Sequence, residues 1–143
     1  MTQVERSALV LHTAEQMFDL INDVESYPQF LPWCAAAEVI SRSEDELVAT
    51  LHLAKSGLKY SFTTRNRLKR PLEMTLELVD GPFSSLSGVW TFTVLSEEAS
   101  KVALNLNFDF SGKLTGLAMG KVFNQVASSM VDAFVSRADK IYV

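Results

Sequence analysis

Cysteine is almost absent from this chain, whose 143 residues include a single one, Cys34. One thiol cannot form an internal disulfide, and this usage is typical of a reducing compartment. No apolar run approaches the roughly eighteen residues that a membrane-spanning helix needs. The residues that follow Met1 lack the basic start and apolar centre of a signal peptide. We therefore expect a cytoplasmic protein that contacts a membrane surface at most transiently.

Motifs for metal binding and for common catalytic chemistry are also missing. His12, His52 and Cys34 do not fall at CxxC, HxxxH or ExxH spacing, so we expect no metal site. Cys34 has no identifiable partner base, and there is no GxSxG motif. Asp80 belongs to an Asp-Gly-Pro turn and Asp109 to the outward set of a strand, so neither is half of an acid–base pair. The sequence favours a binding protein over an enzyme.

Acidic residues outnumber basic ones by 17 to 13, which gives a net charge of −4 and no reason to expect DNA as a partner. Residues 55–70 depart from this balance because they contain six basic residues and no acid. These six, here called the basic cluster, are Lys55, Lys59, Arg65, Arg67, Lys69 and Arg70. They could form a face that contacts RNA or anionic lipid. Cross-strand pairing with Glu73 and Glu77 is the favoured interpretation.

Strand patterns dominate the first three quarters of the chain. Alternating apolar and polar residues predict antiparallel strands at residues 3–11, 46–55, 58–68, 72–80, 89–95 and 102–110. Thr13 stands three residues before Gln16, a capping-box spacing that predicts a helix start. Residues 26–34 hold three aromatic residues and two prolines and should form a short helical turn or a loop. Short turns join these segments, so we expect one α+β domain over residues 1–143.

The last part of the chain predicts one long helix. Residues 113–140 contain no proline, and 28 helical residues extend about 42 Å. Apolar residues recur there at steps of three and four, which places them on one face; they are Met119, Phe123, Val126, Met130, Phe134, Ala138 and Ile141. We expect a curved sheet of six or seven strands around this helix, with two short helices after the first strand. An interior of that kind often holds an apolar ligand.

Large apolar side chains should meet where the sheet, the helix and the aromatic segment converge. The residues predicted to line a ligand cavity are Phe62, Leu76, Trp90, Phe92, Phe108, Phe123, Met130 and Phe134. The residues predicted to form a lid at its entrance are Tyr27, Phe30, Trp33 and Phe83. The alternative is that all of these side chains simply fill a solid core.

Five stretches of the sequence carry a family resemblance that runs from about residue 3 to residue 142. They are residues 23–34 (DVESYPQFLPWC), 62–66 (FTTRN), 78–83 (LVDGPF), 88–92 (GVWTF) and 117–123 (LAMGKVF). Together and in this order, they resemble the family that contains the ribosome association toxins of the RatA type and the mitochondrial coenzyme Q-binding proteins. The bacterial RatA branch is the more similar of the two.

The resemblance implies a START-like, helix-grip fold of the Bet v 1 type, in a group also named for oligoketide cyclases and lipid transport. Because no acid or base for cyclase chemistry is evident, we expect no enzyme. One implied role is to bind ubiquinone or a similar lipid in the interior, as its bound ligand, in support of respiration. The other, that of a toxin in a toxin–antitoxin pair, is to associate with the large ribosomal subunit and block subunit joining. The basic cluster is the candidate docking surface for that role.

Overall fold

The computed structural model describes residues 2–112 and 114–142 and contains one sheet with three helical segments. In chain order the elements are β1 (Thr2–Val10), α1 (Ala14–Asn22), the 3-10 helix η1 (Val24–Gln29), β2 (Cys34–Arg42), β3 (Glu46–Lys55), β4 (Leu58–Lys69), β5 (Glu73–Asp80), β6 (Phe83–Ser96), β7 (Ala99–Phe110) and α2 (Leu114–Ile141). The two short helices after the first strand and the long last helix are as predicted.

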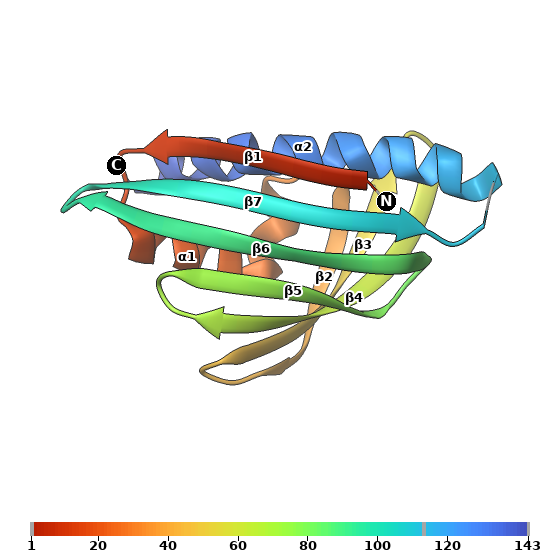
Figure 1. Cartoon of the computed structure of the whole chain (residues 1–143), viewed down its shortest axis with the longest axis horizontal. Coiled ribbons are helices and arrows are strands. Elements are labelled where there is room, and N and C mark those ends of the chain that lie inside the picture. The colour runs from red at the N-terminus through yellow and green to blue at the C-terminus, as the bar shows by residue number, and fades with distance from the viewer. Residues whose placement is uncertain (1, 113, 143) are drawn as a thin grey trace.

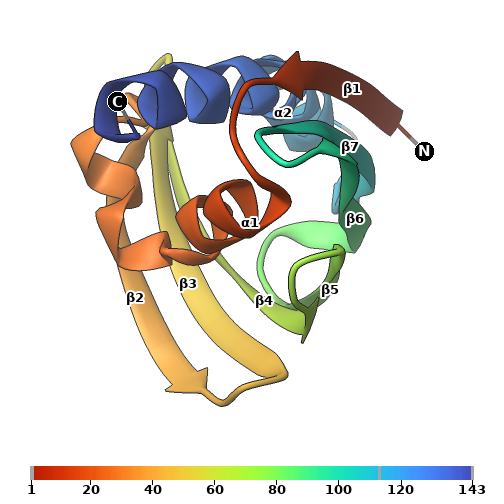
Figure 2. The ribbon, with the colours of Figure 1, turned by 90° about the vertical axis from the view of Figure 1, so that its left-hand side faces the viewer.

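The sheet is fully antiparallel with strand order β1-β7-β6-β5-β4-β3-β2. It curls strongly, so that its edge strands β1 and β2 approach opposite sides of α2 (Figures 1 and 2). Viewed along α2, α1 lies inside the curve of the sheet and covers one end of the interior (Figure 2). This arrangement confirms the predicted helix-grip fold, with seven strands.

Local chemistry explains where the helical segments after β1 begin and end. The Thr13 side chain accepts a hydrogen bond from the Gln16 backbone, and the Gln16 side chain accepts one from the Thr13 backbone, which is the predicted capping box. The chain then turns into η1, where Pro28 fits a short 3-10 segment. The Tyr27 hydroxyl donates to the Ile21 carbonyl oxygen and so ties η1 to α1.

Short turns join the strands, as predicted, but several strand bounds differ, and β2 was not among the predicted strands. Ser56 and Gly57 both have positive φ, as a tight two-residue hairpin requires. A strand was predicted to begin at residue 72, but β5 begins at Glu73 and Leu72 is 57% exposed in the turn. The strand predicted at 89–95 begins earlier, at Phe83, because the chain enters β6 directly after the Gly81-Pro82 turn.

The concave face of the sheet and one face of α2 bury a continuous apolar core. The predicted stripe on α2 is confirmed at Phe123, Val126 and Phe134, which are at most 4% exposed. Ile141 was predicted to belong to the stripe but is 45% exposed at the end of the helix. Within the described residues, no helix is both long enough and apolar enough to span a membrane.

Candidate ligand-binding cavity

A cavity of about 60 Å3 lies between the concave face of the sheet, η1 and α2. The strands supply most of its lining, since β3 to β7 all contribute inward-facing side chains. The lining residues are Val24, Tyr27, Trp33, Ala49, Leu51, Phe62, Thr64, Asn66, Met74, Leu76, Leu86, Trp90, Leu106, Phe123, Val126 and Met130. None of these described lining residues is an acid, a base or a histidine, so the cavity suits an uncharged, largely apolar occupant.

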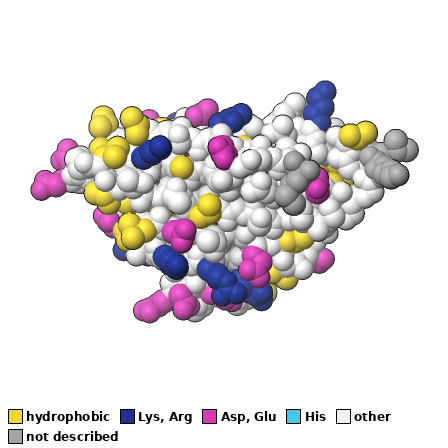
Figure 3. Space-filling model, viewed as in Figure 1, with side chains coloured by type: hydrophobic (Ala, Val, Ile, Leu, Met, Phe, Trp, Pro, Cys, Tyr) yellow, Lys and Arg dark blue, Asp and Glu magenta, His cyan; other side chains and the backbone are white. Residues whose placement is uncertain are grey.

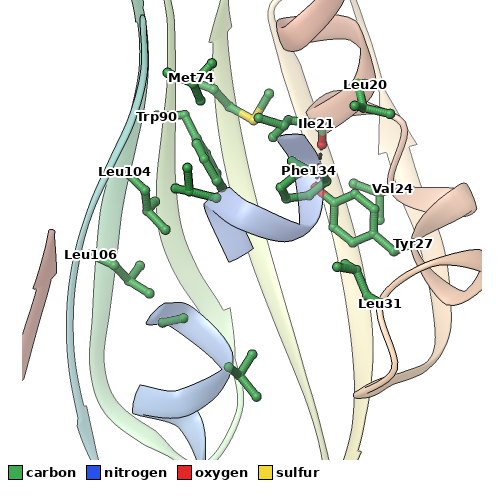
Figure 4. Close-up of a cluster of buried hydrophobic side chains, with 14 of the residues drawn as sticks. Leu20, Ile21, Val24, Tyr27, Leu31, Met74, Trp90, Leu104, Leu106 and Phe134 are labelled. Atoms are coloured by element: carbon green, nitrogen blue, oxygen red, sulfur yellow. Dashed lines mark hydrogen bonds between the residues drawn. The ribbon is translucent and has the colours of Figure 1, made fainter. Parts of the chain in front are cut away.

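Aromatic rings hold the helical side of the cavity in place. Phe134 projects from α2 between the sheet and η1, with its ring centroid 5.6 Å from that of Trp90 and 5.3 Å from that of Tyr27 (Figure 4). Both contacts are edge-to-face, the arrangement that aromatic pairs favour. Burial raises the pKa of Tyr27, whose hydroxyl is already engaged with the Ile21 carbonyl. Tyr27 therefore lines the cavity as an uncharged side chain that is held in a fixed position.

One polar residue stands out in the lining. Asn66 on β4 is only 6% exposed, and its Oδ1 accepts a hydrogen bond of 2.9 Å from the Thr64 hydroxyl. Asn66 was not among the residues predicted from the sequence to line the cavity. Period-2 alternation along β4 was the available signal, because Asn66 stands at alternate positions with Phe62, Thr64 and Leu68 and therefore faces the same side.

The structure brings together five of the eight residues predicted to line the cavity. Those five are Phe62, Leu76, Trp90, Phe123 and Met130. The other three are buried in the core but are not among the lining residues. Phe92 packs against Phe18 of α1, with ring centroids 5.4 Å apart, because α1 occupies that end of the interior. Phe108 packs against Phe123, with ring centroids 4.8 Å apart, and Phe134 packs against Tyr27 and Trp90.

The predicted lid residues do not form one group. Tyr27 and Trp33 line the cavity but are at most 6% exposed, so they close it from within rather than cover it from outside. Phe30 is not in the lining: it packs on Phe134, and the Arg137 guanidinium lies 5.0 Å from its ring centroid. Phe83 is also outside the lining, since it stacks on Phe110 at 4.2 Å. A gating role for any of the four stays a prediction.

The size of the cavity limits what it holds in this conformation. A void of about 150 Å3 accommodates benzene, and the 60 Å3 found here is less than half of that. The interior is therefore far better filled than the sequence analysis anticipated. Met74 and Met130, which contribute flexible thioether side chains to the lining, are the residues best able to move and enlarge it.

Two potentially reactive side chains outside the cavity, His12 and Cys34, are held in structural roles. His12 is 7% exposed, and its Nε2 lies 2.7 Å from Asp139 Oδ1, which joins the β1–α1 connection to the end of α2. Burial raises the pKa of the Cys34 thiol to about 11, so the thiol is protonated at neutral pH. In the described part of the chain, no three histidine, cysteine or carboxylate side chains converge as metal ligands.

Four members of the basic cluster are paired with acids. Arg65 lies 3.5 Å from Glu46 and 3.7 Å from Glu77, and Arg67 lies 3.8 and 4.0 Å from the same two carboxylates. Lys69 pairs with Glu73 at 3.7 Å, and Arg70 with Asp19 at 2.8 Å. The favoured interpretation, cross-strand pairing with Glu73 and Glu77, thus holds for Arg65, Arg67 and Lys69. Arg70 differs, because its partner Asp19 lies on α1. Figure 3 likewise shows Lys and Arg side chains interspersed with Asp and Glu on the face in view.

Lys55 and Lys59, the other two members of the cluster, are exposed on the β3–β4 hairpin. Neither has an acid within 4.0 Å among the described residues. They are the part of the cluster whose charge is available to a partner.

Similar sequences extend over almost the whole chain. A Vibrio cholerae protein named ribosome association toxin RatA is 50% identical over 142 residues, which are 99% of both chains. The Escherichia coli K12 protein of the same name is 45% identical over 99% of this chain and 90% of that protein. A Xenopus laevis protein named mitochondrial coenzyme Q-binding protein COQ10 homologue B is 26% identical over 98% of this chain and 59% of that protein.

Solved structures and a family profile agree with the observed fold. The Zhui aromatase/cyclase from a Streptomyces species superimposes with a TM-score of 0.86 over 99% of this chain and 96% of that one, at 18% identity. Likeness at that identity shows the fold alone. The profile of the family described as polyketide cyclase / dehydrase and lipid transport matches residues 10–135. The chain therefore belongs to the polyketide cyclase/dehydrase and lipid transport family, in the group that includes the RatA proteins.

Proposed function

We propose that this protein binds a neutral hydrophobic molecule, with an isoprenoid quinone such as ubiquinone as the favoured ligand, and that it catalyses no reaction on it. The observation that carries the proposal is the largely apolar cavity between the sheet, η1 and α2, whose described lining has no acid, base or histidine to act on a substrate. The lipid-transport description of the family and the name of the Xenopus laevis relative support the same ligand class.

Ligand binding would require the cavity to open. A quinone ring with its substituents is larger than benzene, so it does not fit the 60 Å3 of the closed state. Rotation of Met74 and Met130 would make room, since methionine changes rotamer at low cost. Each square ångström of apolar ligand surface then removed from water would contribute about 25 cal/mol. A tail of several isoprene units would thereby offset the cost of repacking the interior.

The chain provides its own reporter for this proposal. It has two tryptophans, Trp33 and Trp90, and both line the cavity. A short-chain ubiquinone, decylubiquinone, should quench their fluorescence in a saturable way and raise the melting temperature. Quenching that rises linearly without saturating, together with an unchanged melting temperature, would contradict the proposal.

A matched variant controls for binding elsewhere on the surface. Ala49 lines the cavity and is 3% exposed. Ala49→Leu adds three carbon atoms at that point, which should fill the void while keeping the lining apolar. We expect saturable quenching to disappear in Ala49→Leu. Equal quenching in both proteins would place the quinone outside the cavity.

Association with the ribosome is the second candidate function, and it implies a cytoplasmic location. The observation that favours it is the printed name of the relatives that are 45–50% identical over nearly the whole chain. We infer that the docking surface includes Lys55 and Lys59, because the other members of the basic cluster are neutralised by acids. The two candidate functions are compatible, since one uses the interior and the other the exterior.

Sedimentation tests this second function. The protein should sediment with large ribosomal subunits at low salt and dissociate as the salt concentration rises. The double variant Lys55→Glu with Lys59→Glu should weaken this association, whereas Lys101→Glu, an exposed charge reversal on β7, should not. Failure of the wild-type protein to sediment with large subunits at any salt concentration would remove the function.

A further inference from the structure

The polar pair in the cavity, Thr64 and Asn66, has a hydrogen-bonding capacity that the protein itself does not use. Asn66 sits in the middle of β4, opposite Leu47 of β3 and Leu76 of β5, so apolar side chains flank it on both neighbouring strands. A polar side chain that is 6% exposed is normally retained only when its hydrogen bonds are satisfied. The Thr64 hydroxyl satisfies Oδ1 at 2.9 Å.

The other half of the Asn66 amide is not satisfied in this way. Within residues 2–112 and 114–142, Nδ2 has no hydrogen-bond partner. Because Oδ1 is held by Thr64 and Asn66 lines the cavity, the two N–H donors of Nδ2 are left for an occupant. Nδ2 is not one of the fully buried unpaired atoms of the described residues, so an occupant can reach it. An occupant with an acceptor at this point gains a hydrogen bond, whereas one without an acceptor covers the donor and leaves it unpaired.

We propose that Asn66 anchors the head of the ligand by donating a hydrogen bond from Nδ2 to a carbonyl oxygen, which selects a neutral ligand with a carbonyl head and an apolar tail, such as the quinone proposed above. This inference rests on the proposed binding function and specifies its chemistry. A fatty acid or phospholipid would bring a negative charge into a lining with no described cation to pair with it. A hydrocarbon would leave the amide unpaired.

The position of Asn66 also sets the direction of the ligand. Phe62 lies four residues earlier on β4 and on the same inward face, about 13 Å away at the rise of a strand. Between these two residues the lining is apolar apart from Thr64, and Phe62 contacts Phe123 of α2 at a ring-centroid distance of 5.8 Å. The head group therefore lies at Asn66, and the tail extends along β4 toward the aromatic cluster at Phe62.

Two probes that share a tail separate the anchor from the cavity. Decylubiquinone carries the carbonyl acceptors, and decylbenzene has the same tail without them. The affinity for decylubiquinone is measured by tryptophan quenching, and that for decylbenzene by its displacement of the quinone. The selectivity, which is the ratio of the two affinities, is compared among the wild type, Asn66→Leu and Asn107→Leu. Asn107 lies on the outer face of β7 and provides the matched asparagine-to-leucine change outside the cavity.

The expected result is a selectivity for the quinone that falls about five- to tenfold in Asn66→Leu, the effect of one lost hydrogen bond, and stays at the wild-type value in Asn107→Leu. If Asn66→Leu does not fold, Asn66→Ala is measured instead. An unchanged selectivity in the Asn66 variant would overturn the anchor while leaving the cavity as a binding site. A wild-type protein that binds neither probe would overturn both the anchor and the proposed function.

Discussion

Truncation of Phe123 to alanine tests whether the cavity can be enlarged to the size of a ligand. Phe123 is 4% exposed and lines the void. Its ring centroid lies 4.8 to 5.8 Å from those of four other aromatic rings, namely Phe62, Phe83, Phe108 and Phe110. A buried Phe→Ala change costs about 3–5 kcal/mol, and each aromatic pair adds about 0.5–1.5 kcal/mol to simple burial. We therefore expect a loss of stability of at least about 5 kcal/mol.

The same change should create a binding site for benzene. The void left by the Phe123 ring would join the existing 60 Å3, and a total of about 150 Å3 is enough for benzene. At ten times its Kd, benzene would return about 1.4 kcal/mol of stability to Phe123→Ala. For a chain of this length that corresponds to a rise of roughly 3–6 °C in melting temperature. The wild type should show no such rise.

Urea unfolding and thermal melts with and without benzene measure both effects. Leu117→Ala, at a position that is 75% exposed on α2, serves as the control and should change neither quantity. A stability loss below about 1 kcal/mol in Phe123→Ala would contradict the packing described here. An equal benzene effect in wild type and variant would show that benzene acts elsewhere.

Three further changes test the fold around the cavity. A Cβ at Gly88 would lie 2.6 Å from Leu106 Cδ1 and 3.0 Å from the Asn105 carbonyl oxygen. Gly88→Ala should therefore lower the free energy of unfolding in urea by about 1–3 kcal/mol. An unchanged free energy of unfolding would contradict this close approach. Thr13→Ala removes the capping box of α1 and should cost about 1 kcal/mol, whereas Glu15→Ala at the next exposed position of that helix should cost less. Because burial raises the pKa of Cys34 from 9.0 to about 11, the thiol favours folding below pH 9, and about 2 kcal/mol of stability is lost as the pH rises through 11. Cys34→Ala should lose less over that range, and identical pH profiles for the two proteins would contradict the assignment.

The regular elements could be predicted from the sequence because their signals are local. The alternation along β3, β4 and β7 and the stripe on α2 fix which side chains face inward, and Thr13 with Gln16 marks the start of α1. The bounds of β6 were less predictable, because its first residues, Phe83 to Ser87, do not alternate cleanly before the Gly88 position.

The composition of the cavity was only partly predictable, for a physical reason. Alternation shows that a side chain faces the interior, but it does not show where along α2 that side chain lies. Trp90 and Phe92 both face inward, so alternation could not show that only Trp90 lines the cavity. Phe92 is outside the cavity lining because Phe18 of α1 packs against it. The same alternation places Asn66 on the inward face, but only apolar residues were predicted to line the cavity, and Asn66 is polar. The acid partner Asp19 depends on how α1 packs inside the curled sheet, which no local pattern specifies. Glu46, by contrast, stands opposite Arg67 in the register of the β3–β4 hairpin.

The most direct test of the central claim is to identify what the protein carries when it is isolated from its own cells. The purified wild type and Ala49→Leu are extracted with organic solvent in parallel, and the extracts are compared by mass spectrometry. The cavity account predicts a neutral isoprenoid lipid in the wild-type extract and a strongly reduced amount in the Ala49→Leu extract. An extract without lipid from the wild type, or equal amounts of lipid from both proteins, would contradict it.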